Sequence, residues 1–217
     1  MPITYSVDPA APDEALLAEA AERLRVPGSV FIYPTETFYG LGARHSDTQA
    51  LEKIFRIKGR DETKPLLLLI ENKSWLSRLT DTVPAPADRL MTAFWPGPLT
   101  ILFKASQKLS PLLTGTTGTV GCRHSGNPVA QKLLDFAGEP VTSTSANLAG
   151  GPNPVSIDDM PESLLSSVDI IIDAGPTAGG MPSTVLDASQ ASCPVVRQGA
   201  VTDDAIRCCL SDVSCPE

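Results

Sequence analysis

The feature that most constrains the fold is the alternation of short apolar runs with longer amphipathic segments. Residues 29–33 and 66–70 are apolar or β-rich and only five residues long, which favours buried strands. Residues 47–58 instead carry apolar side chains at helical spacing behind Asp47, a residue type suited to capping a helix: Leu51, Ile54 and Phe55. Two different periods therefore follow one another along the chain.

The same reading extends over the whole sequence. It predicts helices over 11–25, 47–58, 84–94, 127–137 and 203–210. It predicts strands over 29–33, 66–70, 99–104, 119–123, 140–143, 168–173, 184–187 and 194–197. Interleaved strands and helices are typical of the α/β class. With 217 residues and no internal repeat, we expect one domain with a loop-rich active face.

Composition excludes several classes of protein. The longest apolar run spans five residues, 66–70, whereas a membrane-spanning helix needs about 20. The N-terminus has neither a basic start nor an apolar core, so we expect a cytoplasmic protein without a signal peptide. The net charge is −8, and residues 151–217 hold two basic and ten acidic residues. This balance disfavours general nucleic-acid binding but allows a local cationic site for a phosphorylated ligand.

The five cysteines give no zinc-site spacing, and with only two histidines we expect no structural or histidine-based metal centre. Reduced thiols are the simpler interpretation. A disulfide within the C-terminal group is the alternative, and that group comprises Cys208, Cys209 and Cys215.

Three polar segments follow predicted strands or helices and are candidate ligand contacts. YPTETFYGLG (33–42) follows a strand, and ligands of open α/β sheets bind beyond strand ends. KGRDETKP (58–65) offers cations suited to phosphate, and VTSTSANLAGGPNP (141–154) offers alternating hydroxyls. Each also has a structural interpretation, respectively a polar turn, a solvated charged turn and a helix cap or Ser/Thr turn.

Three further segments place polar residues at strand ends. Arg123 ends the predicted strand 119–123, and beside it His124 is expected to be a surface residue rather than a catalytic base. Ser183 lies in the glycine-rich stretch 173–187. Arg197 is an isolated cation in the acidic C-terminal part, so it is either an ion-pair partner or a ligand contact.

Taken together and in this order, the motifs resemble the YrdC-type threonylcarbamoyl-AMP synthases. The resemblance covers about residues 15–205 and rests on YPTETFYGLG, KGR followed by KPL, WPGPLT, TVGCR, STSAN, GMPSTVLD and VVRQGA. It implies a single-domain, twisted mixed α/β sheet with flanking helices and a basic concave active face. It also implies a nucleotidyltransferase that makes L-threonylcarbamoyl-adenylate from L-threonine, bicarbonate and ATP and releases pyrophosphate. The product would serve threonylcarbamoyladenosine formation next to the anticodon in tRNA, through a downstream transferase machinery.

The resemblance also implies roles for individual residues. Those expected at the threonine are Thr37, Arg123 and Ser183. Those expected at the nucleotide are Arg60, Lys64, Thr119, Ser143, Ser145, Asn147, Asn153 and Arg197, with Lys58 and Arg60 as the catalytic cationic pair. Mg²⁺ would arrive with ATP rather than in a dedicated protein site.

The chain departs from the pattern of many relatives at three positions: Leu69, Cys122 and Ser125. Longer relatives have an additional C-terminal domain, so we expect the short, single-domain form. Two other functions remain open: a domain that forms carbamoyl-adenylate, and a non-catalytic module that binds tRNA or double-stranded RNA. The first would lack the amino-acid pocket, and the second would show steeply salt-dependent RNA binding without ATP.

Overall fold

The strands of this chain are divided between two mixed sheets. The computed structural model describes residues 1–59, 61 and 63–211. The first sheet has the order β1-β9-β2-β3-β8. Its strands are β1 (Ile3–Ser6), β2 (Phe31–Tyr33), β3 (Gly40–Gly42), β8 (Thr144–Ser145) and β9 (Ile170–Asp173). The second has the order β11-β10-β5-β6-β4-β7. Its strands are β4 (Leu67–Leu69), β5 (Leu99–Lys104), β6 (Thr119–Arg123), β7 (Val141–Thr142), β10 (Thr184–Asp187) and β11 (Val195–Arg197).

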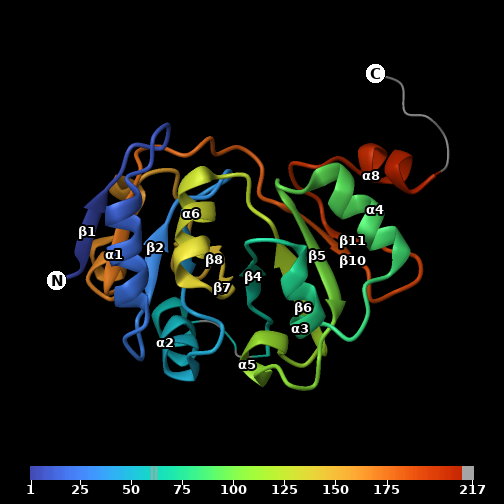
Figure 1. Ribbon diagram of the computed structural model, residues 1–217, viewed down its shortest axis with the longest axis horizontal. Helices are drawn as coiled ribbons and strands as arrows, with labels where there is room; N and C mark the ends of the chain where they lie inside the picture. The colour runs from blue at the N-terminus through green and yellow to red at the C-terminus, as the bar shows by residue number, and fades with distance from the viewer. Residues whose placement is uncertain (60, 62, 212–217) are drawn as a thin grey trace.

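Helices flank both sheets. The α-helices are α1 (Glu14–Leu24), α2 (Thr48–Lys58), α3 (Leu76–Leu79), α4 (Ala85–Phe94), α5 (Pro111–Thr114), α6 (Pro128–Ala137), α7 (Glu162–Leu165) and α8 (Asp203–Leu210). Two 3₁₀ turns are η1 (Lys73–Trp75) and η2 (Ile157–Asp159). Figure 1 shows α1 and α6 side by side on the first sheet, and α4 beside α8 at the far end of the second. None of the helices in the described part of the chain is long and apolar enough to span a membrane.

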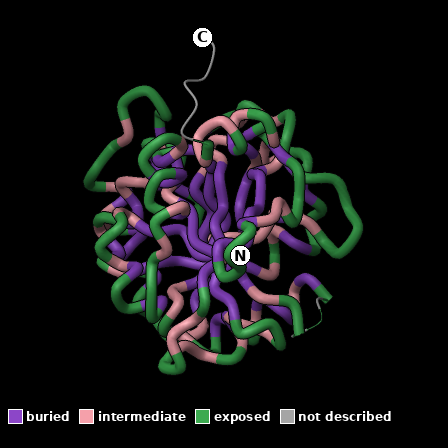
Figure 2. The backbone as a smooth tube through the Cα atoms, turned by 90° about the vertical axis from the view of Figure 1, so that its right-hand side faces the viewer, coloured by how far each residue is buried: buried purple, intermediate pink, exposed green. Residues whose placement is uncertain are grey.

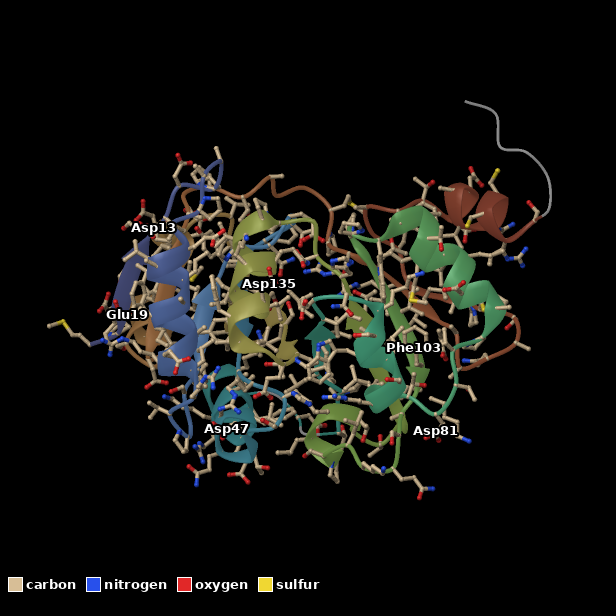
Figure 3. The ribbon with its side chains drawn as sticks, in the orientation of Figure 1. Asp13, Glu19, Asp47, Asp81, Phe103 and Asp135 are labelled. Carbon is tan, nitrogen blue, oxygen red and sulfur yellow. The ribbon has the colours of Figure 1, made fainter. Side chains whose placement is uncertain are left out.

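Side-chain oxygens define where the main helices begin. The carboxylate of Asp13 accepts hydrogen bonds from the backbone N–H groups of Ala15 and Leu16, and Asp47 caps α2 through Ala50 N–H. Figure 3 marks both aspartates at the start of their helices. These bonds satisfy N–H groups that have no partner within the helix.

Alternating strand residues separate two apolar cores. In β2, Phe31 and Tyr33 pack with α1 and α6, whereas Ile32 faces the second core with α2 and the strands of the second sheet. Figure 2 shows the buried residues gathered in the middle of the molecule and the exposed ones around it. Strands that are buried on both faces explain why their sequences are continuous apolar runs.

The predicted α/β class is confirmed, and the predicted strands and longer helices all occur. The sequence analysis expected one sheet, whereas the structure divides the strands between two. The segment 141–145 joins them, because β7 pairs with β4 of the second sheet and β8 pairs with β3 of the first.

Strands β1, β3 and β8 and the short helices α3, α5 and α7 were not predicted. In β3, glycines replace the β-branched residues that indicate a strand. The structure explains the glycine at position 42, because a Cβ there would lie 2.7 Å from the Thr142 carbonyl oxygen and 2.8 Å from Tyr33 Cε1.

Candidate active site

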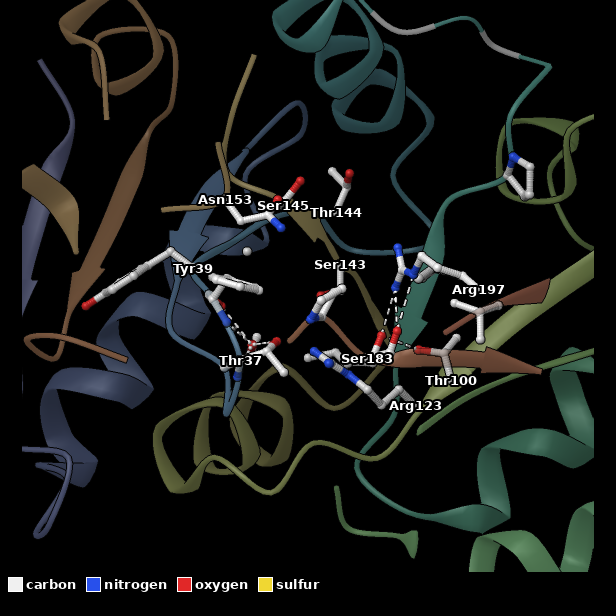
Figure 4. A pocket seen from close by; sticks show the side chains of 18 of the residues that line it. Thr37, Tyr39, Thr100, Arg123, Ser143, Thr144, Ser145, Asn153, Ser183 and Arg197 are labelled. Carbon is white, nitrogen blue, oxygen red and sulfur yellow. Dashed lines mark hydrogen bonds between the residues drawn. The ribbon is translucent and has the colours of Figure 1, made fainter. Parts of the chain in front are cut away.

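A cavity of about 380 Å³ lies between the two sheets. The first sheet contributes Gly40, Thr144 and Ser145, and the loop that follows β2 adds Thr37 and Tyr39. The second contributes residues from all of its strands but β7, including Leu69, Thr100, Arg123, Val185 and Arg197. Figure 4 shows the hydroxyls and the two arginines directed toward one space. The arrangement provides several neutral donors and two cations in one cleft.

The turn after β2 is held by its own threonines. The Thr35 hydroxyl donates to the Phe38 carbonyl oxygen at 2.7 Å and accepts from the Thr37 N–H at 3.2 Å. The two threonine hydroxyls lie 3.0 Å apart. Gly179 N–H and the Thr177 hydroxyl donate to the Thr37 carbonyl oxygen, which ties the glycine-rich segment to this turn. Thr37 is therefore fixed in place at the cavity wall.

Tyr39 forms a second part of this wall. Its hydroxyl donates to the Gly175 carbonyl oxygen at 2.7 Å and accepts from the Ala174 N–H at 3.0 Å. Burial raises the pKa of Tyr39 to about 12, so the phenol stays protonated and keeps its donor at neutral pH.

Arg123 is buried at the end of β6, and its acidic neighbour among the described residues is Glu36. Its Nη1 lies 3.4 Å from Oε1 of Glu36. The other Glu36 oxygen, Oε2, accepts a hydrogen bond from the fully buried Ser125 hydroxyl. The Ser125 Oγ also accepts from Asn127 N–H at 3.2 Å. Glu36 and Ser125 thus restrain the guanidinium that faces the cavity.

Arg197 reaches the same cavity from β11 without an acidic partner among the described residues. Its Nη2 donates to the Ser183 carbonyl oxygen at 2.8 Å and to the Ser183 Oγ at 3.1 Å. Burial and then the positive charge of Arg123 lower the pKa of Arg197. Two cations that repel one another in one cleft favour an anionic ligand.

Lys58 lies behind the cavity and supports its wall. It is the last residue of α2 and is buried rather than part of an exposed polar turn. Its Nζ donates to the carbonyl oxygens of Ser145 at 2.5 Å and Asn147 at 2.8 Å, and to the Asn147 Oδ1 at 3.0 Å. Nearby Lys53 forms an ion pair with Asp169 at 2.7 Å. The charges of Lys53 and Lys58 are therefore used within the protein.

The cavity brings together seven of the predicted site residues: Thr37, Arg123, Ser143, Ser145, Asn153, Ser183 and Arg197. Four others do not line it: Lys58, Lys64, Thr119 and Asn147. Arg60 lies outside the described residues, as does Cys215 of the C-terminal cysteine group.

The structure accounts for three of the four that do not line the cavity. Asn147 turns away because its Oδ1 accepts from Ser145 Oγ and Lys58 Nζ. Thr119 is buried, and its hydroxyl lies 2.8 Å from the Thr117 hydroxyl. Lys64 is exposed in the loop before β4.

The candidate segments 33–42 and 141–154 already contained Thr35, Glu36, Tyr39 and Thr144 but gave them no individual roles. Thr100 was missed altogether. A usable signal existed for Thr100, because a hydroxyl inside the apolar run 99–103 needs a polar partner when it is buried. Glu36 belonged to the candidate segment 33–42, but nothing in the sequence pairs its carboxylate with Arg123.

The remaining predictions concern metals and thiols. The part of the chain that the structure describes holds no group of three or more His, Cys, Asp or Glu residues that could bind a metal ion. Cys122, Cys193 and Cys209 are free thiols. The expectation of reduced thiols is wrong for Cys208, which forms a disulfide.

Comparison with known proteins identifies the family. The model of the Sua5/YciO/YrdC family, described as "Telomere recombination", matches residues 24–199. The chain belongs to the Sua5/YciO/YrdC family. Threonylcarbamoyl-AMP synthase of Bacillus subtilis is 37% identical over 198 residues, and that of Pyrococcus abyssi is 34% identical over 186 residues. That of Vibrio vulnificus is 35% identical over 174 residues.

Coverage differs among these family members. The three alignments take in 91%, 86% and 79% of this chain. The chain spans 57% and 55% of the length of the Bacillus and Pyrococcus proteins, but 92% of the Vibrio protein.

Solved structures of the family have the same fold. P. abyssi Sua5 complexed with L-threonine superposes with a TM-score of 0.91 at 33% identity, covering 97% of this chain and 62% of that one. E. coli YciO superposes with a TM-score of 0.81 at 33% identity, covering 92% of this chain and 96% of that one. A twisted mixed α/β architecture with flanking helices is thus the family fold.

Proposed function

We propose that this chain is a threonylcarbamoyl-AMP synthase. It joins L-threonine, bicarbonate and ATP into L-threonylcarbamoyl-adenylate and releases pyrophosphate. The observation that carries the proposal is the cavity between the sheets, where Arg123 and Arg197 face one space beside a row of hydroxyls. The relatives in the family that are named threonylcarbamoyl-AMP synthases support the same reaction.

In this proposal one side of the cavity takes the amino acid. Arg123 binds the threonine carboxylate, because a guanidinium forms two parallel hydrogen bonds with a carboxylate. Thr37 and Ser183 contact the rest of the amino acid from opposite walls. The complex of P. abyssi Sua5 with L-threonine supports an amino-acid site in a chain of this fold.

The other side takes the nucleotide. Arg197, Ser143, Ser145 and Asn153 bind its phosphates or sugar, with Arg60, Lys64 and Thr119 as further contacts. Lys58 contributes charge from behind the wall and holds the Ser145 and Asn147 carbonyls in place. The basic concave face that the family resemblance implies belongs to this proposal.

The reaction needs positioning and charge stabilisation rather than a protein nucleophile. The threonine amine takes up bicarbonate-derived carbon dioxide as a carbamate, and a carbamate oxygen then attacks the α-phosphorus of ATP. Pyrophosphate leaves as the new P–O bond forms. Cations and hydroxyls around the phosphates stabilise the charge that develops in this step. Mg²⁺ enters as part of the ATP substrate.

The proposal includes the use of the product. The adenylate would supply the threonylcarbamoyl group for adenosine next to the anticodon of tRNA, through a cytoplasmic transferase machinery. Direct contact with tRNA is a further part of the proposal that the assay below does not require.

Pyrophosphate release tests the proposed function. The protein is incubated with ATP, bicarbonate and each amino acid in turn, and with carbamoyl phosphate in place of amino acid and bicarbonate. Release that depends on L-threonine and bicarbonate together is expected. Equal release without threonine would contradict the proposal, and release with carbamoyl phosphate alone would favour a carbamoyl-adenylate former.

A further inference from the structure

Three polar groups from three different segments meet at one point of the cavity wall. The Ser183 hydroxyl precedes β10, Thr100 belongs to β5, and Arg197 ends β11. Ser183 Oγ lies 3.0 Å from Thr100 Oγ1 and 3.1 Å from Arg197 Nη2. Figure 4 shows these contacts as dashed lines on the side of the cavity nearest Arg123.

The backbone around Ser183 is held firmly. Thr184 N–H donates to the Pro98 carbonyl oxygen at 3.0 Å, and Ala200 N–H donates to the Pro182 carbonyl oxygen at 2.8 Å. A Cβ at Gly199 would lie 2.2 Å from that same Pro182 oxygen, so the returning loop packs directly on this segment. The serine side chain is therefore presented from a fixed position.

The chemistry of the three groups limits how the protons are arranged. A guanidinium only donates, so the Ser183 Oγ accepts from Arg197. The Oγ has one further lone pair and one proton. Thr100 is fully buried, and its hydroxyl has no other hydrogen-bond partner in the described structure. Either Thr100 donates to Ser183, or Ser183 gives its only proton to Thr100.

These two arrangements differ in whether the hydroxyl proton of Ser183 is available to a ligand in the cavity. When Thr100 donates, both lone pairs of Ser183 Oγ are occupied and its proton is directed toward the cavity. When Ser183 donates to Thr100, no serine proton remains for a ligand. An anionic oxygen in the cavity selects the first arrangement, because it accepts the serine proton.

We propose that Thr100 and Arg197 are positioning residues that act through Ser183, turning its hydroxyl into a donor toward an anionic oxygen of the bound amino acid. The inference rests on the proposed function, which places the amino acid at Arg123 and Ser183. It gives Arg197 a second role besides the nucleotide contact, and it assigns a role to Thr100, which touches the ligand only through the serine.

Calorimetric titration with L-threonine, L-serine and L-valine tests this inference. Thr100→Val removes the hydroxyl while keeping the side-chain volume, and it should weaken amino-acid binding about threefold to tenfold. Thr100→Ser keeps the hydroxyl and should bind within about twofold of the wild type. ATP affinity without amino acid should change less than about twofold in both variants, a split that general damage to the fold does not produce.

A double-mutant cycle tests the route through the serine. In a Ser183→Ala background, Thr100→Val should cause no further loss of amino-acid affinity. Thr80→Val is the matched control, because Thr80 is also buried and its hydroxyl donates to a β5 carbonyl oxygen, that of Lys104 at 2.7 Å. The control variant should bind the amino acid like the wild type.

Each other outcome overturns the inference. It fails if Thr100→Val binds like the wild type, if its loss persists undiminished in the Ser183→Ala background, or if Thr80→Val shows the same loss. Should Thr100→Val not fold, Thr100→Cys replaces it with the same expectation, since a thiol is a weak donor. Wild-type binding of another amino acid but not threonine overturns the proposed substrate alone, whereas binding of none overturns both proposals.

Discussion

Two regions of the molecule place arginine beside glutamate: the cavity, and a cluster of Arg44, His45 and Glu139 next to β7 that we call the junction. The two regions balance their charges differently. At the junction, Oε1 of Glu139 accepts a hydrogen bond from Arg44 Nε, and Oε2 of Glu139 lies 2.8 Å from His45 Nδ1. In the cavity, Arg123 shares its neighbour Glu36 with a serine, and Arg197 has only neutral partners among the described residues. The junction is matched in charge, whereas the cavity carries excess positive charge.

The two regions therefore have different physical consequences. Burial alone raises the pKa of Glu139, but favourable interactions with His45, Ser46 and Arg44 outweigh it and hold the pKa at about 2. In the cavity, burial first and then the positive charge of Arg123 lower the pKa of Arg197. Removing one partner of the paired junction destabilises the fold, whereas the excess positive charge of the cavity favours an anionic ligand.

Arg123→Ala should produce the largest change. Losing hydrogen bonds from a cation to a carboxylate costs about 1.5–3 kcal/mol, so the threonine concentration needed should rise roughly 10- to 150-fold. ATP binding measured without threonine should change little. Calorimetric titration of the variant with each substrate measures both effects. Loss of ATP binding with threonine binding retained would mean that the two sides of the cavity are assigned in reverse.

Glu139→Gln should act on stability and not on the cavity. Because the folded-state pKa of Glu139 is depressed from 4.5 to about 2, its contribution is present above pH 4.5 and is lost as the pH falls toward 2. The variant should unfold more easily at pH 7, by about 2 kcal/mol, and should lose less stability between pH 4.5 and 2. Chemical denaturation at a series of pH values measures this. If the variant lost as much stability as the wild type between pH 4.5 and 2, Glu139 would not be the source of that pH dependence, and the proposed difference between the two regions would be contradicted.

Arg197→Ala should have an intermediate effect that distinguishes it from Arg123→Ala. Its side chain is more exposed, so loss of the phosphate contact should weaken ATP binding by about 1.4 kcal/mol, or roughly tenfold. Threonine binding should weaken less, through the released Ser183. Titrations with each ligand, alone and together, give the comparison. Unchanged ATP affinity would leave Arg197 as a structural partner of Ser183.

The strength of the sequence signals explains which of these residues could be foreseen. Arg123 and Arg197 are isolated cations at the ends of apolar strands, a pattern that indicates a ligand or an ion pair. Lys58 was correctly located on its helix, yet only the structure reveals that its ammonium group holds carbonyls of the 141–147 segment. Glu36 and Thr100 act through partners distant in sequence, Arg123 and Ser183, and such pairings depend on how two sheets meet.

Ser125→Ala should give the smallest change and tests how firmly Arg123 is held. The buried hydroxyl joins Glu36 to the backbone at the start of α6, so its loss leaves two polar groups with one partner fewer. The free energy of unfolding should fall by about 1 kcal/mol. Glu36 would then restrain Arg123 less, and threonine affinity should fall about twofold to threefold while ATP affinity stays constant. Ser167→Ala is the matched control, because that hydroxyl donates to the Leu164 carbonyl oxygen at 2.6 Å and does not line the cavity. Equal loss of threonine affinity in both variants would show that the restraint of Arg123 does not depend on Ser125.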